Sequence, residues 1–143
     1  MATKSEQTLV EEWRDVLALH ARTICELDRA LHQHGLGASD FEVLDVLAEI
    51  PVGAQGDDCS YRVQELASRV HLSQSALSRL VARLERDGLV TRGMCSEDRR
   101  GVRVRLTDEG RARHAQVQPV QRAVLSRMLS GVPEPAVNAH TAT

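Results

Sequence analysis

Residues 66–112 read LASRVHLSQSALSRLVARLERDGLVTRGMCSEDRRGVRVRLTDEGRA, and this stretch decides the fold. Its start belongs to a short helix that we expect over 63–70, because the apolar residues there share one helical face. A tight turn at His71 follows, and then a second helix that Ser73 caps and Gly88 ends. This second helix has one apolar face for the core, and its other face is polar.

The second half of the stretch changes from a helical period to a strand period. Residues 89–94 and 102–106 are two short extended runs, and the second run alternates valine with arginine. The polar residues 95–101 are expected to join them as a loop. Helix, tight turn, helix and hairpin is the plan of a winged helix-turn-helix, which we place at residues 60–110 of a single domain spanning 1–143.

A long helix is expected before this region. Residues 6–34 carry apolar or ring-bearing side chains at alternating steps of three and four, which form a heptad seam that Gly35 ends. Such a seam packs either on its own domain or on a helix of a second subunit, and its length favours the second subunit. The expected dimerisation residues are Val10, Trp13, Leu17, His20, Ile24, Leu27 and Leu31.

Two further helices complete the expected fold. Ser39 and Glu42 are spaced as a capping box for a helix that runs to Ile50. Thr107 caps a last long helix, expected over 108–130 as the second part of the dimerisation region. The predicted fold class is therefore mainly α with a small β-hairpin wing, a winged helix-turn-helix with long N- and C-terminal dimerisation helices.

The composition is typical of one globular domain whose charge is unevenly divided along the chain. The net charge is -2, but residues 60–113 hold 12 Lys and Arg against 7 Asp and Glu, while residues 1–59 hold 4 against 12. Arginine accounts for 17 of the 18 basic residues, and its forked guanidinium suits phosphates and guanine. No apolar run approaches the ~18 residues of a spanning helix, and no secretory signal is readable, so we expect a cytoplasmic protein without a membrane partner.

The basic charge points to double-stranded DNA as the partner of the second helix and the hairpin. A helix in the major groove offers polar side chains near its N-terminus. An arginine on a narrow wing can enter the minor groove, where an aspartate beside it holds its side chain. We expect Arg83 and Arg86 at phosphates, and we expect Arg103, which alternates with valines, to face water or phosphate. The complete set of expected DNA-binding residues is Ser73, Gln74, Ser75, Ala76, Ser78, Arg79, Arg83, Arg86, Asp98, Arg99, Arg100 and Arg103.

Residues 66–112 resemble the DNA-binding region of the MarR family of bacterial transcription regulators, and the order of the flanking helices extends the resemblance to about residues 6–130. The family's wing pattern, D-x-R-x-x-x-V-x-L-T followed by glycine, is met by Asp98, Arg100, Val104, Leu106, Thr107 and Gly110. The resemblance implies a homodimeric repressor on a pseudo-palindromic operator. It assigns the minor-groove role to Arg100 and the orienting role to Asp98.

The resemblance also implies a way of release from DNA. Members of the family mostly respond to small, often aromatic anions or to thiol oxidation, so a small-molecule effector of unidentified class is an expected partner. The chain departs from the family at Ala76, where threonine is common, at Pro119 inside the last long helix, and in the short tail 131–143.

Two other functions stay open on the residues alone. One is a redox-sensing regulator that acts through Cys95, which lies among several arginines, whereas Cys25 is expected to be a structural thiol. The other is a winged-helix module whose basic face binds an acidic protein. An enzyme is not expected, since the sequence has no Gly-rich phosphate loop, GxSxG or HExxH, and neither a cofactor nor a metal is expected.

Overall fold

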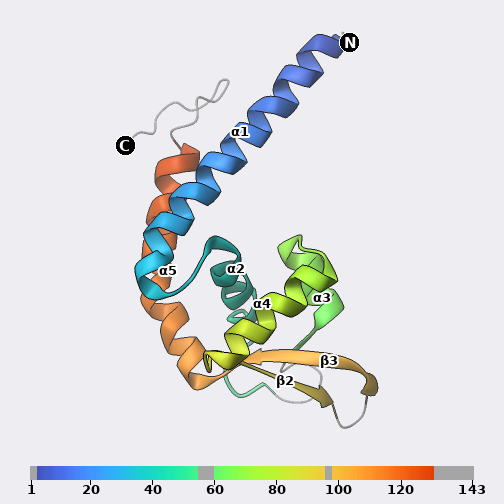
Figure 1. The fold of residues 1–143 in the computed structure, drawn as a ribbon, viewed down its shortest axis with the longest axis vertical. Coiled ribbons are helices and arrows are strands. Elements are labelled where there is room, and N and C mark those ends of the chain that lie inside the picture. The colour runs from blue at the N-terminus through green and yellow to red at the C-terminus, as the bar shows by residue number, and fades with distance from the viewer. Residues whose placement is uncertain (1–2, 55–59, 96–97, 131–143) are drawn as a thin grey trace.

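The computed structural model describes residues 3–54, 60–95 and 98–130, with the backbone alone at 94–95 and 98–101 (Figure 1). Helices α1 and α5 lie side by side, while α2, α3, α4 and a small sheet form a body at the other end of α5. The fold class expected from the sequence is confirmed. The elements in chain order are α1 (Glu6–Leu31), the 3-10 helix η1 (His32–His34), α2 (Ala38–Leu47), β1 (Tyr61–Arg62), α3 (Val63–Val70), α4 (Gln74–Arg86), β2 (Val90–Cys95), β3 (Asp98–Leu106) and α5 (Asp108–Ser130).

The helix-turn-helix is built from the local signals of the sequence. Helix α3 has the expected bounds and ends at His71, whose φ of 60° is left-handed and closes the helix. Ser73 then begins α4, because its Oγ accepts the N–H of Ala76 at 3.1 Å. Gly88, with a φ of 82°, ends the turn after α4. These three signals are confirmed.

The sheet has three antiparallel strands in the order β1-β3-β2. The expected loop over 95–101 is wrong, because β3 begins at Asp98 and Cys95 pairs with Asp98 across the hairpin. The register is irregular between Met94 and Cys95, which explains why simple alternation does not reveal the longer pairing. Strand β1 was not expected, since a two-residue strand directly before a helix carries no alternating pattern.

The start of α2 differs from the expected capping box. Gly37, and not Ser39, is the N-cap, and Asp40 Oδ2 accepts the N–H of Gly37 at 2.7 Å. Asp28 of α1 accepts the next amide, that of Ala38, also at 2.7 Å. Carboxylates therefore satisfy both amides, and the Ser39–Glu42 pair is not the box. The helix itself ends at Leu47, short of the predicted end, and turns follow it.

The core divides the heptad seam of α1 into two parts. Leu31 is fully buried in the main core beside Phe41, and Leu27 packs with Ala38 and Val124 in a second cluster. The expectation that Leu27 and Leu31 bind a second subunit is therefore wrong, because α2 and α5 of the same chain already cover them. The N-terminal half of α1 instead projects away from the body (Figure 1). Its exposed large apolar side chains are Leu9, Trp13, Val16 and Leu17.

A close joint connects α5 to the base of the wing. Thr107 Oγ1 accepts the N–H of Gly110 at 2.9 Å and donates to the carbonyl of Gly88 at 2.7 Å. Gly110 is buried against the carbonyl of Leu89, where a Cβ would overlap the backbone. From this joint α5 runs as far as Ser130, and the exposed Pro119 does not interrupt it.

Candidate nucleic-acid interface

Helix α4 presents the predicted polar residues on one face. The opposite face buries leucine and valine side chains in the core, which fixes the rotation of the helix about its axis. Ala76 is half-buried on the same helix, and its side chain is a single methyl group. The sequence period thus predicts the outward face correctly over the first two turns, and its exposed members are Ser73, Gln74, Ser75, Ser78 and Arg79.

The arginines in the last turns of α4 differ in their surroundings. Arg86 is exposed, in agreement with the expected phosphate contact. The guanidinium of Arg83 pairs through Nη2 with Asp40 Oδ1 of α2, a carboxylate that is almost fully buried. The sequence gives no signal for this partner, because 43 positions separate the two residues. An intramolecular ion pair therefore occupies Arg83, which the sequence places at a phosphate.

The wing projects from the body as a two-stranded arm formed by β2 and β3 (Figure 1). The side chains of Asp98, Arg99 and Arg100 lie outside the described part of the chain, so their predicted groove contacts are not tested. The thiol of Cys95 lies outside it as well. Cys25 is exposed on α1 in the single chain, so this chain alone does not bury it as a core thiol would be buried.

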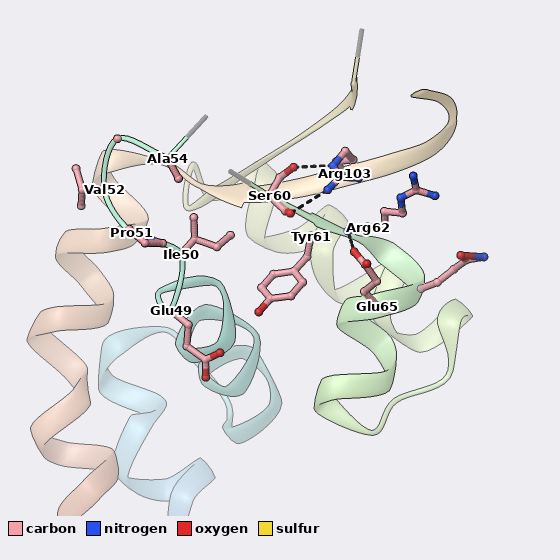
Figure 2. Close-up of a pocket in the computed structure, with 12 residues that line it drawn as sticks. Glu49, Ile50, Pro51, Val52, Ala54, Ser60, Tyr61, Arg62, Glu65 and Arg103 are labelled. Carbon is pink, nitrogen blue, oxygen red and sulfur yellow. Dashed lines mark hydrogen bonds between the residues drawn. The ribbon is translucent and has the colours of Figure 1, made fainter. Parts of the chain in front are cut away.

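The prediction that Arg103 faces water or phosphate is wrong. Arg103 is 9% exposed, and its Nε and Nη2 donate to the Oγ and the carbonyl of Ser60 at 2.8 and 3.1 Å (Figure 2). Alternation assumes that one face of the hairpin is open, whereas β1 pairs with β3 at this point, with Arg62 opposite Arg103. Strand β1 and Ser60 thus take up the side of β3 that alternation leaves open.

A recess of about 1080 Å³ lies beside this arginine, between residues 49–54 and 60–65 (Figure 2). Two of its lining residues, Glu49 and Tyr61, accept hydrogen bonds from Arg69 at 2.9 and 3.0 Å. The hydrogen bond to Glu49 raises the pKa of Arg69. Because these polar groups already bond one another, the recess does not single out a ligand.

A polar cluster joins α2 of the body to α5. His114 Nε2 lies 2.7 Å from Asp45 Oδ1, and Arg122 Nη2 approaches the same oxygen at 3.2 Å. The His114 ring also stacks on Phe41, with centroids 5.3 Å apart. Burial raises the pKa of the neighbouring Glu42 carboxyl, and the negative charge of Asp45 raises it further. This cluster fixes α2 of the body against α5.

Within the residues that the structure describes, no group of three or more potential ligands could hold a metal ion. In the same part of the chain, none of the helices combines the length and the apolar character that a membrane span requires.

Known proteins agree with this architecture. A sequence model of the MarR family matches residues 58–102, the helix-turn-helix with most of the wing. Sco3205 of Streptomyces coelicolor, a MarR family transcriptional regulator solved in complex with DNA, is 30% identical, with a TM-score of 0.76 over 94% of this chain and 80% of that one. The chain belongs to the MarR family.

Two further relatives of this MarR-family protein are informative. This chain is 35% identical to the transcriptional repressor MdtR of Bacillus subtilis, in an alignment that covers 52% of this chain and 48% of MdtR. CouR of Rhodococcus jostii RHA1, solved bound to p-coumaroyl-CoA, is 26% identical with a TM-score of 0.68 over 82% of this chain and 78% of that one. The matches to curated relatives span less than two thirds of their length.

Proposed function

We propose that this MarR-family protein is a sequence-specific, DNA-binding transcription repressor that acts as a homodimer in the cytoplasm and without catalysis. The observation that carries the proposal is α4, whose polar face is exposed on a helix-turn-helix inside the basic segment of the chain. The complex of Sco3205 with DNA supports the same partner. The repressor role is supported by the name of MdtR.

In this proposal each part of the surface has a separate task. Gln74, Ser75, Ser78 and Arg79 contact base edges in the major groove, and the methyl group of Ala76 contacts a thymine methyl. Ser73 and Arg86 bind phosphates, which fix the register of the helix. From the wing, Arg99 and Arg100 contact the minor groove and its edges, and Asp98 orients Arg100.

The dimer forms through the projecting half of α1. Trp13 and Leu17 are 59% and 47% exposed in the single chain, and Leu9 and Val16 extend the same apolar surface. In a two-fold dimer a second copy of the chain covers this surface, so the same apolar side chains are removed from water on both subunits. Val10 and His20 are the remaining seam positions that we assign to the interface, whereas Ile24 packs against the cluster of Leu27, Ala38 and Val124 in the same chain.

Selection of bound DNA from a random pool tests the function directly. We expect the full chain to enrich a palindrome whose half-sites are one helical turn apart, about 34 to 36 Å. Gln74→Ala or Arg79→Ala should cost about 1 to 3 kcal/mol on the selected site and much less on random DNA. Gln64→Ala is the matched control, since Gln64 is also an exposed helical glutamine but lies on α3. A pool without any shared sequence would contradict the function.

Sedimentation tests the dimer. We expect the wild type to be dimeric at micromolar concentration without DNA, and Trp13→Glu to shift it towards monomer. Val52→Glu is the control, because Val52 is 81% exposed and lies outside the helices. A wild type that sediments as a monomer would remove α1 from the proposed interface.

We also propose an organic anion as the effector, which the bound p-coumaroyl-CoA of CouR supports. Salicylate, p-coumarate and p-coumaroyl-CoA are the probes, added to the preformed complex with the selected DNA. Release of the DNA by one of them is the expected result, and retention of the complex with all three contradicts this part of the proposal.

A further inference from the structure

Arg83 connects the DNA-facing helix to the rest of the chain. It lies on α4, the helix that carries the exposed polar face, and its Nη2 pairs with Asp40 Oδ1 on α2. The two partners are unequally buried, since the side chain of Arg83 is 47% exposed and that of Asp40 only 9%. A carboxylate with so little access to water needs partners for its charge.

Asp40 uses its two oxygens for two different elements. Oδ2 accepts the N–H of Gly37 at 2.7 Å and so caps α2, while Oδ1 accepts from Arg83 of α4. The same carboxylate therefore fixes the start of one helix and the position of another. Among the described residues, loss of the Arg83 charge would leave the buried Asp40 carboxylate with only its capping bond to Gly37.

The connection continues into α1. Asp28 Oδ1 accepts the N–H of Ala38 at 2.7 Å, next to the amide that Asp40 accepts. A Cβ on Gly37 would lie 3.2 Å from Asp28 Oδ1 and 3.6 Å from Asp40 Oδ2, so a glycine leaves room for both carboxylates. Hydrogen bonds to the adjacent amides of Gly37 and Ala38 thus connect α1 to the start of α2, and Asp40 connects that start to α4.

We propose that Arg83 is a positioning residue, which holds α4 at a fixed orientation relative to α1 through Asp40 and so sets the separation of the two DNA-facing helices in the dimer. This inference rests on the proposed function, in which α1 forms the dimer and α4 reads the operator. In a two-fold dimer a rotation of α4 against α1 occurs in both subunits, so it changes the separation twice over. The operator spacing that the dimer accepts depends on that separation.

The test separates positioning from phosphate contact on DNA. Arg83→Met and Asp40→Asn are compared with wild type on selected operators whose half-site spacing is changed by one base pair in either direction. We expect the ratio of affinities for the native and the altered spacings to fall in both variants, and to fall by about the same factor in each. The slope of log K against log salt should stay at the wild-type value, because no phosphate contact is removed.

Arg86→Met is the matched control, since Arg86 is an exposed arginine one turn further along α4. It should lower the salt slope by about 0.9, the value of one phosphate, and keep the spacing preference. Arg83→Lys should restore much of the preference, because an ammonium can still pair with Asp40. A salt slope lowered by about 0.9 in Arg83→Met, together with unchanged spacing, would overturn the inference.

A measurement without DNA keeps the inference independent of the operator. Spin labels on exposed sites of α1 and α4, at Arg22→Cys and Ser78→Cys in a chain whose native cysteines are serines, report the distance between these helices. We expect Arg83→Met to shift or broaden the distance distribution and Arg86→Met to leave it unchanged. An unchanged distribution in Arg83→Met overturns positioning even if Asp40→Asn fails to fold. A wild type that selects no operator contradicts the proposed function instead.

Discussion

Gly110→Ala tests the joint between the wing and α5. The new Cβ would overlap the carbonyl of Leu89 and lie 3.0 Å from both the carbonyl carbon of Leu89 and Leu106 Cδ2. Leu89 is a buried backbone neighbour and not the end of a flexible side chain, so it cannot turn aside. The first turn of α5 has to move by on the order of 1 Å to relieve the overlap.

Such a movement affects the hydrogen bonds of the joint. The N–H of Thr107 donates to the carbonyl of Leu89 at 3.1 Å, and a shift of this size breaks that bond. Overpacking costs about 1 to 3 kcal/mol, and we take the upper end because the new Cβ meets the backbone of Leu89, which cannot turn aside. The lost bond adds about 1 kcal/mol, and the better helix propensity of alanine returns about the same amount. We therefore expect the free energy of unfolding to fall by about 3 kcal/mol.

Urea unfolding followed by circular dichroism measures this loss, at one protein concentration because dimerisation contributes to stability. Gly93→Ala is the control. Gly93 lies in β2 with nothing within 4 Å of its Cβ position and without a left-handed φ, so its variant should stay within about 0.5 kcal/mol of wild type. Equal unfolding midpoints for the two variants would refute the close packing inferred at Gly110.

Three further predictions follow from burial. Because burial raises the pKa of Glu42 above its usual 4.5, the stability linked to its proton is present at acid pH and is lost as the pH rises through the raised value. Glu42→Gln should therefore be more stable than wild type at pH 7, and this difference in the free energy of unfolding should vanish near pH 4 in urea titrations. The same difference at both pH values would contradict the raised pKa. Arg103→Met should lower stability by about 1 to 3 kcal/mol and leave the salt slope of DNA binding unchanged, since Arg103 bonds Ser60 and not phosphate. A lower salt slope in Arg103→Met would show that Arg103 contacts a phosphate after all. Leu27→Ala should cost about 2 to 5 kcal/mol by leaving a cavity between α1, α2 and α5, whereas Leu17→Ala should mainly weaken the dimer in sedimentation. Equal stability of these two variants would mean that the seam is not divided.

The sequence alone determines the features that depend on neighbours a few positions apart. The bounds of α3, the cap at Ser73 and the stop at Gly88 follow from hydrogen bonds and backbone angles within one turn. The outward face of α4 follows from the helical period, because an apolar stripe on one side fixes where the polar residues lie. These local rules were sufficient to predict the fold class and the first two turns of the candidate DNA surface.

The tertiary structure decides which of the predicted surfaces stay open. Arg83 and Arg103 read as free, exposed cations in the sequence, yet each bonds a residue 43 positions away. Ser60 bonds the buried Arg103, whereas Asp40 pairs with an Arg83 that stays half exposed. The heptad seam is uniform in the sequence, but α5 and α2 cover only its C-terminal half, which leaves Trp13 exposed and buries Leu31. A periodic pattern shows that a face is apolar or charged, while the segment that covers it comes from a distant part of the chain, and its position depends on how the whole core packs.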